Sequence, residues 1–581
     1  MGMQNLKRRI DCAAKREKCD LVIKNALVFS VFTGETEEGD IAVADGVVVA
    51  IGKGYEGERE YDAKGAAAIP GLIDAHIHVE SSLLSPEAFA SLAVPHGTTG
   101  IVADPHELVN VCGIAGAEYV REAFSRLFLD GINPLDVYLQ LPSCVPATPF
   151  ETSGAVIDGR ETERELGRDL FFGLGEMMNY PAVVGADADV LRKLTAAKEL
   201  DKVIDGHAPA LTGEDLNGYL AAGIRTDHEC ISAEECMQKL ARGMYIQLRN
   251  GSSAHNIDVN YKAMNAFNFR RFILCSDDKN APDLARNGHM DDALRKLVRY
   301  GVPAAWAICC ATLNTAECYG LKDKGAIAPA YSADIVLVNN LTDFDPIAVF
   351  KQGKLVAEHK KPLFQCNLRY LPQEVGSTVR IKDVTPDSFR MSIASGRARA
   401  MYVVPDSLVT EEVCVPVKTE NGDVVLANTD LTKLAVVERH FATGNIGLAL
   451  VKGYGLKNAA IGISVAHDSH NLVIMGDDNG KMARATELLK EAGGGMAVVT
   501  DGREEMFPLD IAGLMSSASS EEVIARTAEI GELAKAQGIK EGYEPFMTLA
   551  FLSLAVIPKL RLTDRGLFDV ETFAFTDTEI K

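Results

Sequence analysis

The middle of the chain repeats one pattern of apolar and polar positions. A short, continuous apolar run ends in polar residues, and helical sequence follows. The eight runs are AAAIPGLIDAHIHVE, TTGIVADPHE, DVYLQLPSCVP, FFGLGEMMNY, KVIDGHAP, IRTDHE, MYIQLRNGS and RFILCSDD. Continuous apolar runs that alternate with helices are typical of a parallel sheet buried on both faces. Eight such units in roughly 250 residues predict a (β/α)8 barrel, an α/β fold, over residues 70–320. Its first strand is expected over residues 66–73.

The two flanks of the barrel carry a different pattern. Alternating β sequence with the turn signal Asp45-Gly46 covers residues 20–52, and similar sequence returns at residues 332–358. We therefore expect a small composite β domain built from residues 1–69 and 321–370. From residue 371 to residue 581, β runs mix with amphipathic helices, which predicts an additional C-terminal α/β or α+β domain.

Length, charge and cysteine usage exclude several classes of protein. A chain of 581 residues is too long for one core, and a net charge of −22 argues against a nucleic-acid partner. The twelve cysteines form no C-x-x-C pair, so we expect free thiols in a reducing cytoplasm. The N-terminal residues lack the apolar core of a signal peptide, and no apolar run is long enough to span a bilayer. We expect a cytoplasmic homo-oligomer, a dimer or larger, without a membrane partner.

Histidines and carboxylates gather at the predicted strand ends, which form the active site in this kind of barrel. His76 and His78 are two residues apart, so both point to one face of an extended strand. A lone histidine there is more often structural, but four imidazoles with two acids indicate a metal site. The polar residues at these ends are His76, His78, Asp104, His106, Glu107, Glu176, His207, His228, Glu229, Asp277 and Asp278.

The types of ligand narrow the choice of metal. Imidazoles and carboxylates without a thiolate suit Zn, Mn, Fe or Co better than Ca or Mg. Six protein ligands are too many for one open catalytic ion, and they suit two divalent ions that share a carboxylate and a water.

The segment PGLIDAHIH, with later single histidines and a final aspartate, resembles the amidohydrolase superfamily. The segments HVESSLLSP, GTTGIVADPHE, GEMMNYP, DGHAP, TDHE, CSDDKNAPDL and RHFATGNIGLALVKGYGLKNAAIGISVAHDSHN are similar to the prokaryotic adenine deaminase family, which has a C-terminal domain of its own. This resemblance implies that His76, His78 and Asp277 bind a first metal and that His207 and His228 bind a second. Many superfamily members bridge the ions with a carboxylated lysine, but the matching strand has none, so Glu176 is the expected bridge. Mn²⁺ or Fe²⁺ is the expected metal, with Zn²⁺ as an alternative.

The resemblance implies hydrolytic deamination of adenine to hypoxanthine and ammonia, a purine salvage reaction in which hydroxide between the two ions attacks C6. Asp277 would accept the proton of the water, and a further acid must protonate N1 and the leaving amine. Glu107 and Glu229 are the candidates for this acid. Asp104, His106 and Asp278 are expected substrate contacts, with support of neighbouring side chains as the alternative role.

Two other functions are alternatives to this one. The first is another binuclear amidohydrolase, which would act on a cyclic amide such as a hydantoin or dihydropyrimidine. It would use the same histidines and aspartate, but Glu176 in place of the bridging lysine counts against it. A non-catalytic barrel would require a degraded ligand set, and here every position is filled. Outside the barrel, His467 and His470 flank an acid and could bind metal, reach the barrel mouth or, like His440, belong to a polar network of the C-terminal domain.

Overall fold

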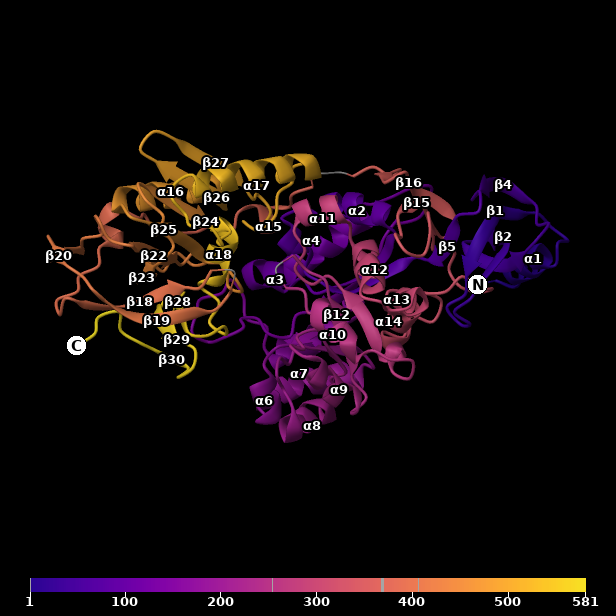
Figure 1. Cartoon of the computed structure of the whole chain (residues 1–581), viewed down its shortest axis with the longest axis horizontal. Helices are drawn as coiled ribbons and strands as arrows, with labels where there is room; N and C mark the ends of the chain where they lie inside the picture. Colours follow the sequence, from indigo (N-terminus) through magenta and orange to yellow (C-terminus); the bar gives the residue numbers. More distant parts are fainter. Residues whose placement is uncertain (1, 253, 367–369, 406) are drawn as a thin grey trace. The chain divides into compact units, whose positions relative to one another are not determined.

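The computed structural model describes residues 2–252, 254–366, 370–405 and 407–581 (Figure 1). The chain forms two compact units. The first, the barrel unit, contains residues 1–105, 120–143 and 158–368. The second, the C-terminal unit, contains residues 106–119, 144–157 and 369–581. Each unit is described by itself.

Eight parallel strands follow one another through the barrel unit in chain order. The first five form one sheet and the last three another, and an isolated parallel bridge pairs Ile77 with Asp277, between the ends of the first and last strands. The sheets meet where the Gly206 N–H donates to Thr226 Oγ1, 3.0 Å away. The (β/α)8 prediction is therefore confirmed. The strands are β6 (Leu72–Ile77), β7 (Thr98–Ala103), β8 (Asp136–Leu141), β9 (Gly173–Met177), β10 (Val203–Gly206), β11 (Thr226–Asp227), β12 (Tyr245–Arg249) and β13 (Phe272–Cys275).

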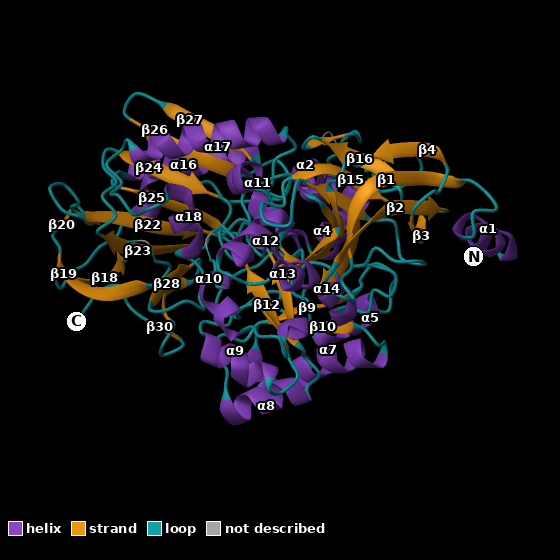
Figure 2. Cartoon of the chain, turned by 45° about the vertical axis from the view of Figure 1, so that its right-hand side comes forward, coloured by secondary structure: helices purple, strands orange, loops and turns teal. Residues whose placement is uncertain are grey.

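Helices separate the strands (Figure 2), and side chains cap the first turns of some of them. Asp158, Asp187 and Ser232 each accept a hydrogen bond from a backbone N–H of the helix that follows them, which satisfies donors that the helix itself leaves unpaired. The helices are α2 (Pro86–Ala93), α5 (Gly159–Leu166), α6 (Tyr180–Val184), α7 (Ala188–Glu199), α8 (Gly213–Ala221), α9 (Ala233–Leu240), α10 (Ile257–Asn260), α11 (Ala281–Asn287), α12 (Met290–Arg299), α13 (Ala304–Cys310) and α14 (Leu313–Cys318); α4 (Ile114–Ser125) runs from one unit into the other.

A nine-stranded sheet joins the two flanks of the barrel. Its path is β17-β16-β15-β14-β5-β1-β2-β3, with β4 paired to β1. Apolar side chains from both flanks, including Ile23, Val43 and Ile335, form its buried core. A helix, α1 (Met3–Ala13), precedes the sheet. Its strands are β1 (Cys19–Phe29), β2 (Thr36–Ala44), β3 (Val47–Gly52), β4 (Gly57–Asp62), β5 (Ala67–Pro70), β14 (Ile335–Val338), β15 (Pro346–Lys351), β16 (Lys354–Glu358) and β17 (Lys361–Pro362).

The single strand expected over residues 66–73 is in fact two strands of two different sheets. The chain leaves β5 of the composite sheet at Pro70 and enters β6 of the barrel at Leu72. Gly71 makes this change possible, because a Cβ at this position would lie only 2.2 Å from Thr99 Oγ1. The prediction of one strand was therefore wrong in its bounds, although both halves are buried.

The C-terminal unit is an eight-stranded sheet with helices beside it. The strand order is β19-β18-β23-β22-β25-β24-β26-β27, and α16 packs on β24, β25 and β26 through a buried core that includes Leu472, Leu489 and Val499 (Figure 1). The strands are β18 (Arg397–Val403), β19 (Thr410–Pro416), β22 (Leu431–Val437), β23 (Ile446–Lys452), β24 (Ala459–Ile463), β25 (Leu472–Gly476), β26 (Gly495–Thr500) and β27 (Glu504–Pro508). Two short sheets hold β20 (Thr419–Glu420), β21 (Asp423–Val424), β28 (Leu560–Thr563), β29 (Gly566–Asp569) and β30 (Ala574–Phe575), and the helices are α3 (His106–Cys112), α15 (Gln373–Gly376), α16 (Asn479–Ala492), α17 (Ser520–Lys535) and α18 (Pro545–Phe551).

Two further features bear on the predictions from sequence. All twelve cysteines lie in the described part of the chain, and each is a free thiol. Among the described residues, no helix is long and apolar enough to cross a membrane.

Candidate metal centre

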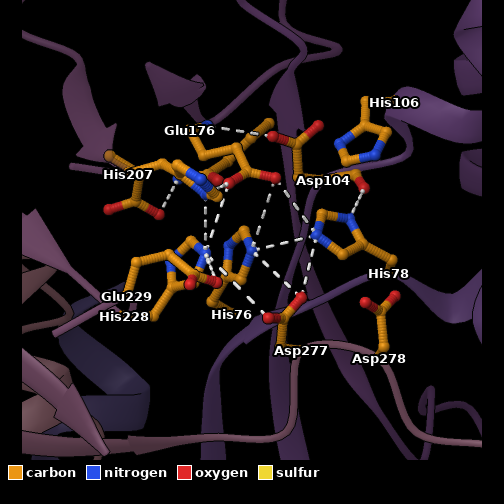
Figure 3. A network of polar contacts seen from close by, with 12 residues as sticks. His76, His78, Asp104, His106, Glu176, His207, His228, Glu229, Asp277 and Asp278 are labelled. Atoms are coloured by element: carbon orange, nitrogen blue, oxygen red, sulfur yellow. Dashed lines mark hydrogen bonds and ion pairs between the residues drawn. The ribbon is translucent and has the colours of Figure 1, made fainter. Parts of the chain in front are cut away.

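The six predicted metal ligands converge at the carboxyl ends of the barrel strands (Figure 3). His76 lies near the end of β6, and Glu176 lies in β9. His78, His207 and His228 each follow directly after a strand, and Asp277 lies two residues beyond the end of β13. Five of the six are buried, while the side chain of His207 keeps 26% of its surface exposed. Parallel strands bring their carboxyl ends to one rim, which is why residues 200 positions apart meet.

The first group of ligand atoms surrounds His78. Its Nε2 atom lies 3.1 Å from Nε2 of His76, 3.2 Å from Oδ1 of Asp277 and 3.3 Å from Oε1 of Glu176. An ion bound to nitrogen and oxygen ligands at about 2.0–2.2 Å keeps neighbouring ligand atoms about 3.0–3.5 Å apart. The spacing of these atoms therefore fits a shared metal ion.

The tautomer of His78 supports the same conclusion. Its Nδ1 atom lies 2.8 Å from the backbone carbonyl oxygen of Asp104, which can only accept a hydrogen bond. Nδ1 therefore carries a proton, and Nε2 is the atom that faces the oxygens of Asp277 and Glu176. Burial opposes a charge on the ring, but these carboxylates raise the pKa of His78 well above its usual value, so the position between them calls for a positive charge that a metal ion can supply in place of the proton.

The second group of ligand atoms lies on the other side of Glu176. His207 Nδ1 lies 2.7 Å from Glu176 Oε2 and 3.3 Å from His228 Nε2, and His228 Nε2 lies 3.2 Å from the same Glu176 oxygen. Glu176 thus turns one oxygen to each histidine pair, Oε1 to His78 and Oε2 to His207 and His228. This geometry fits a carboxylate that bridges two ions.

Burial and neighbouring charges shift the pKa values of these ligands in opposite directions. Burial lowers the pKa of His76 well below its usual value. Burial also opposes protonation of His228, but the carboxylates of Glu176 and Asp277 outweigh it and raise the pKa to about 9. Burial would raise the pKa of Asp277, yet Arg249 and His78 hold that pKa well below its usual range. Without ions the carboxylates keep protons on neighbouring imidazoles, and divalent ions would displace those protons.

Arg249, at the end of β12, is a residue that the sequence reading did not single out. Its Nη1 group donates hydrogen bonds to Glu229 and to Oδ2 of Asp277. His228 Nε2 lies 3.7 Å from Glu229 Oε1 and 4.0 Å from Asp277 Oδ2. The two carboxylates that Arg249 binds therefore lie beside the second ligand group. A charged residue at the end of an apolar run was the only signal that the sequence offered.

The expected substrate contacts have different surroundings. Asp104 supports two ligands, because its carbonyl accepts from His78 and its carboxylate accepts from the backbone N–H of Glu176, 3.0 Å away. The Asp278 carboxylate accepts a hydrogen bond from the hydroxyl of Ser81. His106 begins α3 in the C-terminal unit, where its Nε2 lies 3.3 Å from Glu107 Oε1. A contact of any of the three with substrate stays a prediction.

A second cluster of histidines surrounds Glu107 within the C-terminal unit. His467 Nδ1 lies 2.5 Å from Glu107 Oε1, and His470 Nε2 donates to Oε2. The backbone N–H of Ala466 donates to Nδ1 of His470 at 3.0 Å, so that nitrogen has no proton and Nε2 must carry one. A neutral His470 therefore has no lone pair at Nε2 for a metal ion. This cluster is a hydrogen-bonded network around a carboxylate, in contrast to the site at His78.

The charges of this network follow from burial and contact. Burial opposes ionisation of Glu107, but the neighbouring imidazoles hold its pKa well below the usual value. Burial lowers the pKa of His470 to about 4, so the ring donates as a neutral group. His440, in the same unit, donates from Nε2 to the carbonyl of Ser469, 2.7 Å away.

Buried charges beneath the second ligand group fix its strand ends. Lys239 in α9 is fully buried and bonds the Asp227 carboxylate at 2.8 Å and the carbonyl of Ala208 at 2.7 Å. The other Asp227 oxygen accepts from the Ala208 N–H at 2.9 Å. Ala208 follows His207 and Asp227 precedes His228, so this network ties together the backbone on which both ligands sit.

Comparison with known proteins agrees with the site. The amidohydrolase family profile matches residues 67–356, and the adenine deaminase C-terminal domain profile matches residues 407–574. A relative from Desulfotalea psychrophila called adenine deaminase 2 is 45% identical over 584 residues, which cover 100% of each chain. A protein called adenine deaminase from Clostridium acetobutylicum is 41% identical and covers 99% of this chain and 100% of its own. This chain therefore belongs to the adenine deaminase family of the amidohydrolases.

Proposed function

We propose that this protein hydrolyses adenine to hypoxanthine and ammonia at a centre that holds two divalent metal ions. The chemistry is supported by the ligand set, in which Glu176 turns one oxygen to each of two histidine pairs. The substrate is supported by similarity to proteins named adenine deaminase, which extends over the whole chain. The match of the C-terminal domain profile carries most weight, because it distinguishes this family from other amidohydrolases.

The six ligands would bind the two ions in two groups. His76, His78 and Asp277 would hold one ion, and His207 and His228 would hold the other. Glu176 would bind both ions. Divalent ions in this position lower the pKa of water from about 15.7 toward neutrality, which supplies a nucleophile at neutral pH.

The proton transfers fall to carboxylates. Asp277 accepts the proton of the attacking water as the oxygen bonds to C6 of adenine. N1 gains a proton as C6 becomes tetrahedral, and N6 leaves as ammonia after it is protonated. Glu229 is one candidate for the acid, since it lies beside His228. Glu107 is the other candidate, and because the imidazoles beside it hold its pKa low, it would have to take up a proton with the substrate before it acts as an acid.

Several finer features belong to this proposal. Mn²⁺ or Fe²⁺ would be the native metal, with Zn²⁺ as the alternative, because imidazole and carboxylate ligands accept several first-row ions. Asp104, His106 and Asp278 would contact or align the substrate. The protein would act in purine salvage in the cytoplasm as a homo-oligomer.

The test combines metal analysis with ammonia release. The chain would be stripped with a chelator, reloaded separately with Mn²⁺, Fe²⁺ or Zn²⁺, and supplied with adenine, adenosine, hydantoin or dihydrouracil. The proposal expects two ions per chain and ammonia from adenine alone, with Asp277→Asn as the inactive control. Hydrolysis of hydantoin or dihydrouracil in preference to adenine would contradict the proposal and favour a cyclic-amide hydrolase.

A further inference from the structure

The seventh barrel strand contributes no metal ligand to the site, but it contributes a cation. Arg249 is the last residue of β12, and its side chain keeps 15% of its surface exposed. Its backbone N–H donates to Oδ1 of Asn256, 2.8 Å away, and the Asn256 side chain donates to the carbonyl of His228. These hydrogen bonds tie the backbone around Arg249 to the strand end that carries His228. The backbone position from which the guanidinium group extends is therefore fixed.

Arg249 contacts only one of the two oxygens of Asp277. Oδ1 lies 3.2 Å from Nε2 of His78, while Oδ2 accepts a hydrogen bond from Nη1 of Arg249. This contact fixes the rotation of the carboxylate, so that one oxygen faces the histidine that would hold an ion and the other faces the guanidinium. Asp277 is the proposed proton acceptor, which places Arg249 next to the reacting atoms.

The hydrogen-bond donors of Arg249 are only partly used. Nη1 carries two N–H groups, and its bonds to Glu229 and Asp277 use both. Among the residues that the structure describes, no partner accepts from Nε or Nη2, and neither atom is sealed from solvent. Three N–H groups in one rigid plane are thus left for a ligand.

The chemistry of adenine needs such a donor. Its ring nitrogens N1, N3 and N7 are acceptors, and an ionised carboxylate such as that of Asp277 cannot donate to them. N1 must receive a proton during the reaction, which a guanidinium cannot give up. N3 lies across the ring from C6. N7 is bonded to C5, the ring atom next to C6, and keeps its lone pair throughout the reaction, so it is the acceptor that suits a permanent cation.

We propose that Arg249 is a substrate-binding residue that donates from Nε or Nη2 to N7 of the purine while Nη1 holds Asp277 beside C6. The inference rests on the proposed deamination of adenine. A hydrogen bond from a cation to N7 withdraws electron density from the purine ring, which makes C6 more open to attack by water. Glu229 accepts a hydrogen bond from Nη1 and so helps to hold the guanidinium group in place.

The test removes the two partners separately and together. Wild type, Arg249→Met and Arg249→Lys would be assayed with adenine, 7-deazaadenine, which has CH in place of N7, and 3-deazaadenine. Loss of a hydrogen bond to a charged group should lower kcat/KM about 10- to 100-fold. We expect this loss when either N7 or Arg249 is removed, and little further loss when both are. Electronic effects of the deaza ring act on all three enzymes and cancel in the comparison.

Readouts other than turnover guard against indirect effects. Binding of hypoxanthine and 7-deazahypoxanthine would be measured by calorimetry, and the metal content of each variant by elemental analysis. Arg249→Lys can still hold Asp277, so it should keep its metal and lose the preference for N7. Arg270→Met, at an exposed arginine, is the matched control and should behave as wild type.

The outcomes separate the two proposals. Equal losses for adenine and 7-deazaadenine in the Arg249 variants would overturn the N7 contact and leave Arg249 as a positioning residue for Asp277. Coupling to 3-deazaadenine instead would also overturn it. A wild-type protein that binds no purine and releases no ammonia from any of the three compounds would show that the proposed function itself is wrong.

Discussion

Nδ1 of His78 lies 2.8 Å from the backbone carbonyl of Asp104, whereas Nδ1 of His470 accepts a hydrogen bond from the backbone N–H of Ala466 at 3.0 Å. The two bonds have opposite consequences for the far nitrogen of each ring. As neutral rings, His78 presents a lone pair at Nε2, and His470 presents a proton. Two clusters of histidine and carboxylate with similar composition are thus a candidate metal site in one case and a proton-holding network in the other.

Replacing Glu176 by Gln should weaken metal binding and lower activity, because the two ions would lose the carboxylate that they share. The amide keeps the shape of the side chain but loses the charge that both histidine pairs face. Removal of an outer partner of a metal ligand typically costs 10- to 100-fold, so loss of the bridge should lower kcat by at least about 100-fold. Elemental analysis should find fewer than two ions per chain. Full metal content and activity would show that Glu176 is not the bridge, and Glu163→Gln, at an exposed site, serves as the control.

Replacing Lys239 by Met should weaken metal binding without touching a ligand. The change leaves the carboxylates of Asp227 and Glu235 buried without their cation, which costs about 3–5 kcal/mol in the free energy of unfolding. Because Asp227 aligns the backbone beside His207 and His228, affinity for the second ion should fall about 10- to 100-fold. Calorimetric metal titration and thermal melting measure the two effects. A loss of stability with unchanged affinity for both ions would limit Lys239 to a structural role, and Lys262→Met is the exposed control.

Replacing His470 by Leu should destabilise the C-terminal unit and leave the metal content unchanged. The Glu107 carboxylate would lose a donor in a buried position, which costs about 1.5–3 kcal/mol. His470→Gln keeps an N–H group near the position of Nε2 and should cost less. Denaturant unfolding measures the difference between the variants. A drop of one metal ion per chain in His470→Leu would contradict the tautomer argument and indicate a further metal site.

Replacing Glu151 by Gln should stabilise the protein at alkaline pH. Burial and the neighbouring Asp468 carboxylate raise the pKa of Glu151 from 4.5 to about 8. The folded state therefore holds a proton that the unfolded state releases above pH 4.5, and this contribution to stability is lost as pH rises toward 8. The amide has no proton to lose, so Glu151→Gln should melt at least about 3 °C higher than wild type near pH 9 and equally near pH 4.

The matched experiment for Glu151 alters its neighbour. Asp468→Asn removes the charge that opposes ionisation of Glu151, so it should reduce the pH dependence of melting without abolishing it. If the melting temperatures of wild type and Glu151→Gln run parallel over this pH range, the raised pKa of Glu151 is wrong.

Much of the barrel could be predicted from sequence, because strands buried on both faces read as continuous apolar runs and the barrel topology brings their ends together. The side chains of His76, His78, Glu176, His207, His228 and Asp277 do lie together at the strand ends, and their role as metal ligands stays a prediction. The bounds of the first strand were wrong, because an apolar run does not reveal that Gly71 moves the chain from one sheet to another.

Contacts between distant, ordinary-looking positions could not be predicted. Arg249 and Lys239 are single charged residues, and such residues usually lie on the surface. His467 and Glu107 are 360 positions apart, and no local pattern indicates that they meet. Their pairing is set by the packing of segment 106–119 among the elements of the C-terminal unit, which hydrophobic periodicity does not encode.

This arrangement has a consequence for the synthesis of the chain. Residues 106–119 and 144–157 belong to the same compact unit as residues 369–581. At about 5–20 residues per second, a ribosome needs roughly 10–50 s to make the intervening segment. Throughout that interval the buried carboxyl group of Glu107 in α3 has not yet met His467 and His470. The C-terminal unit therefore cannot complete its hydrogen bonds until translation is nearly over, although part of it is made in the first third of the chain.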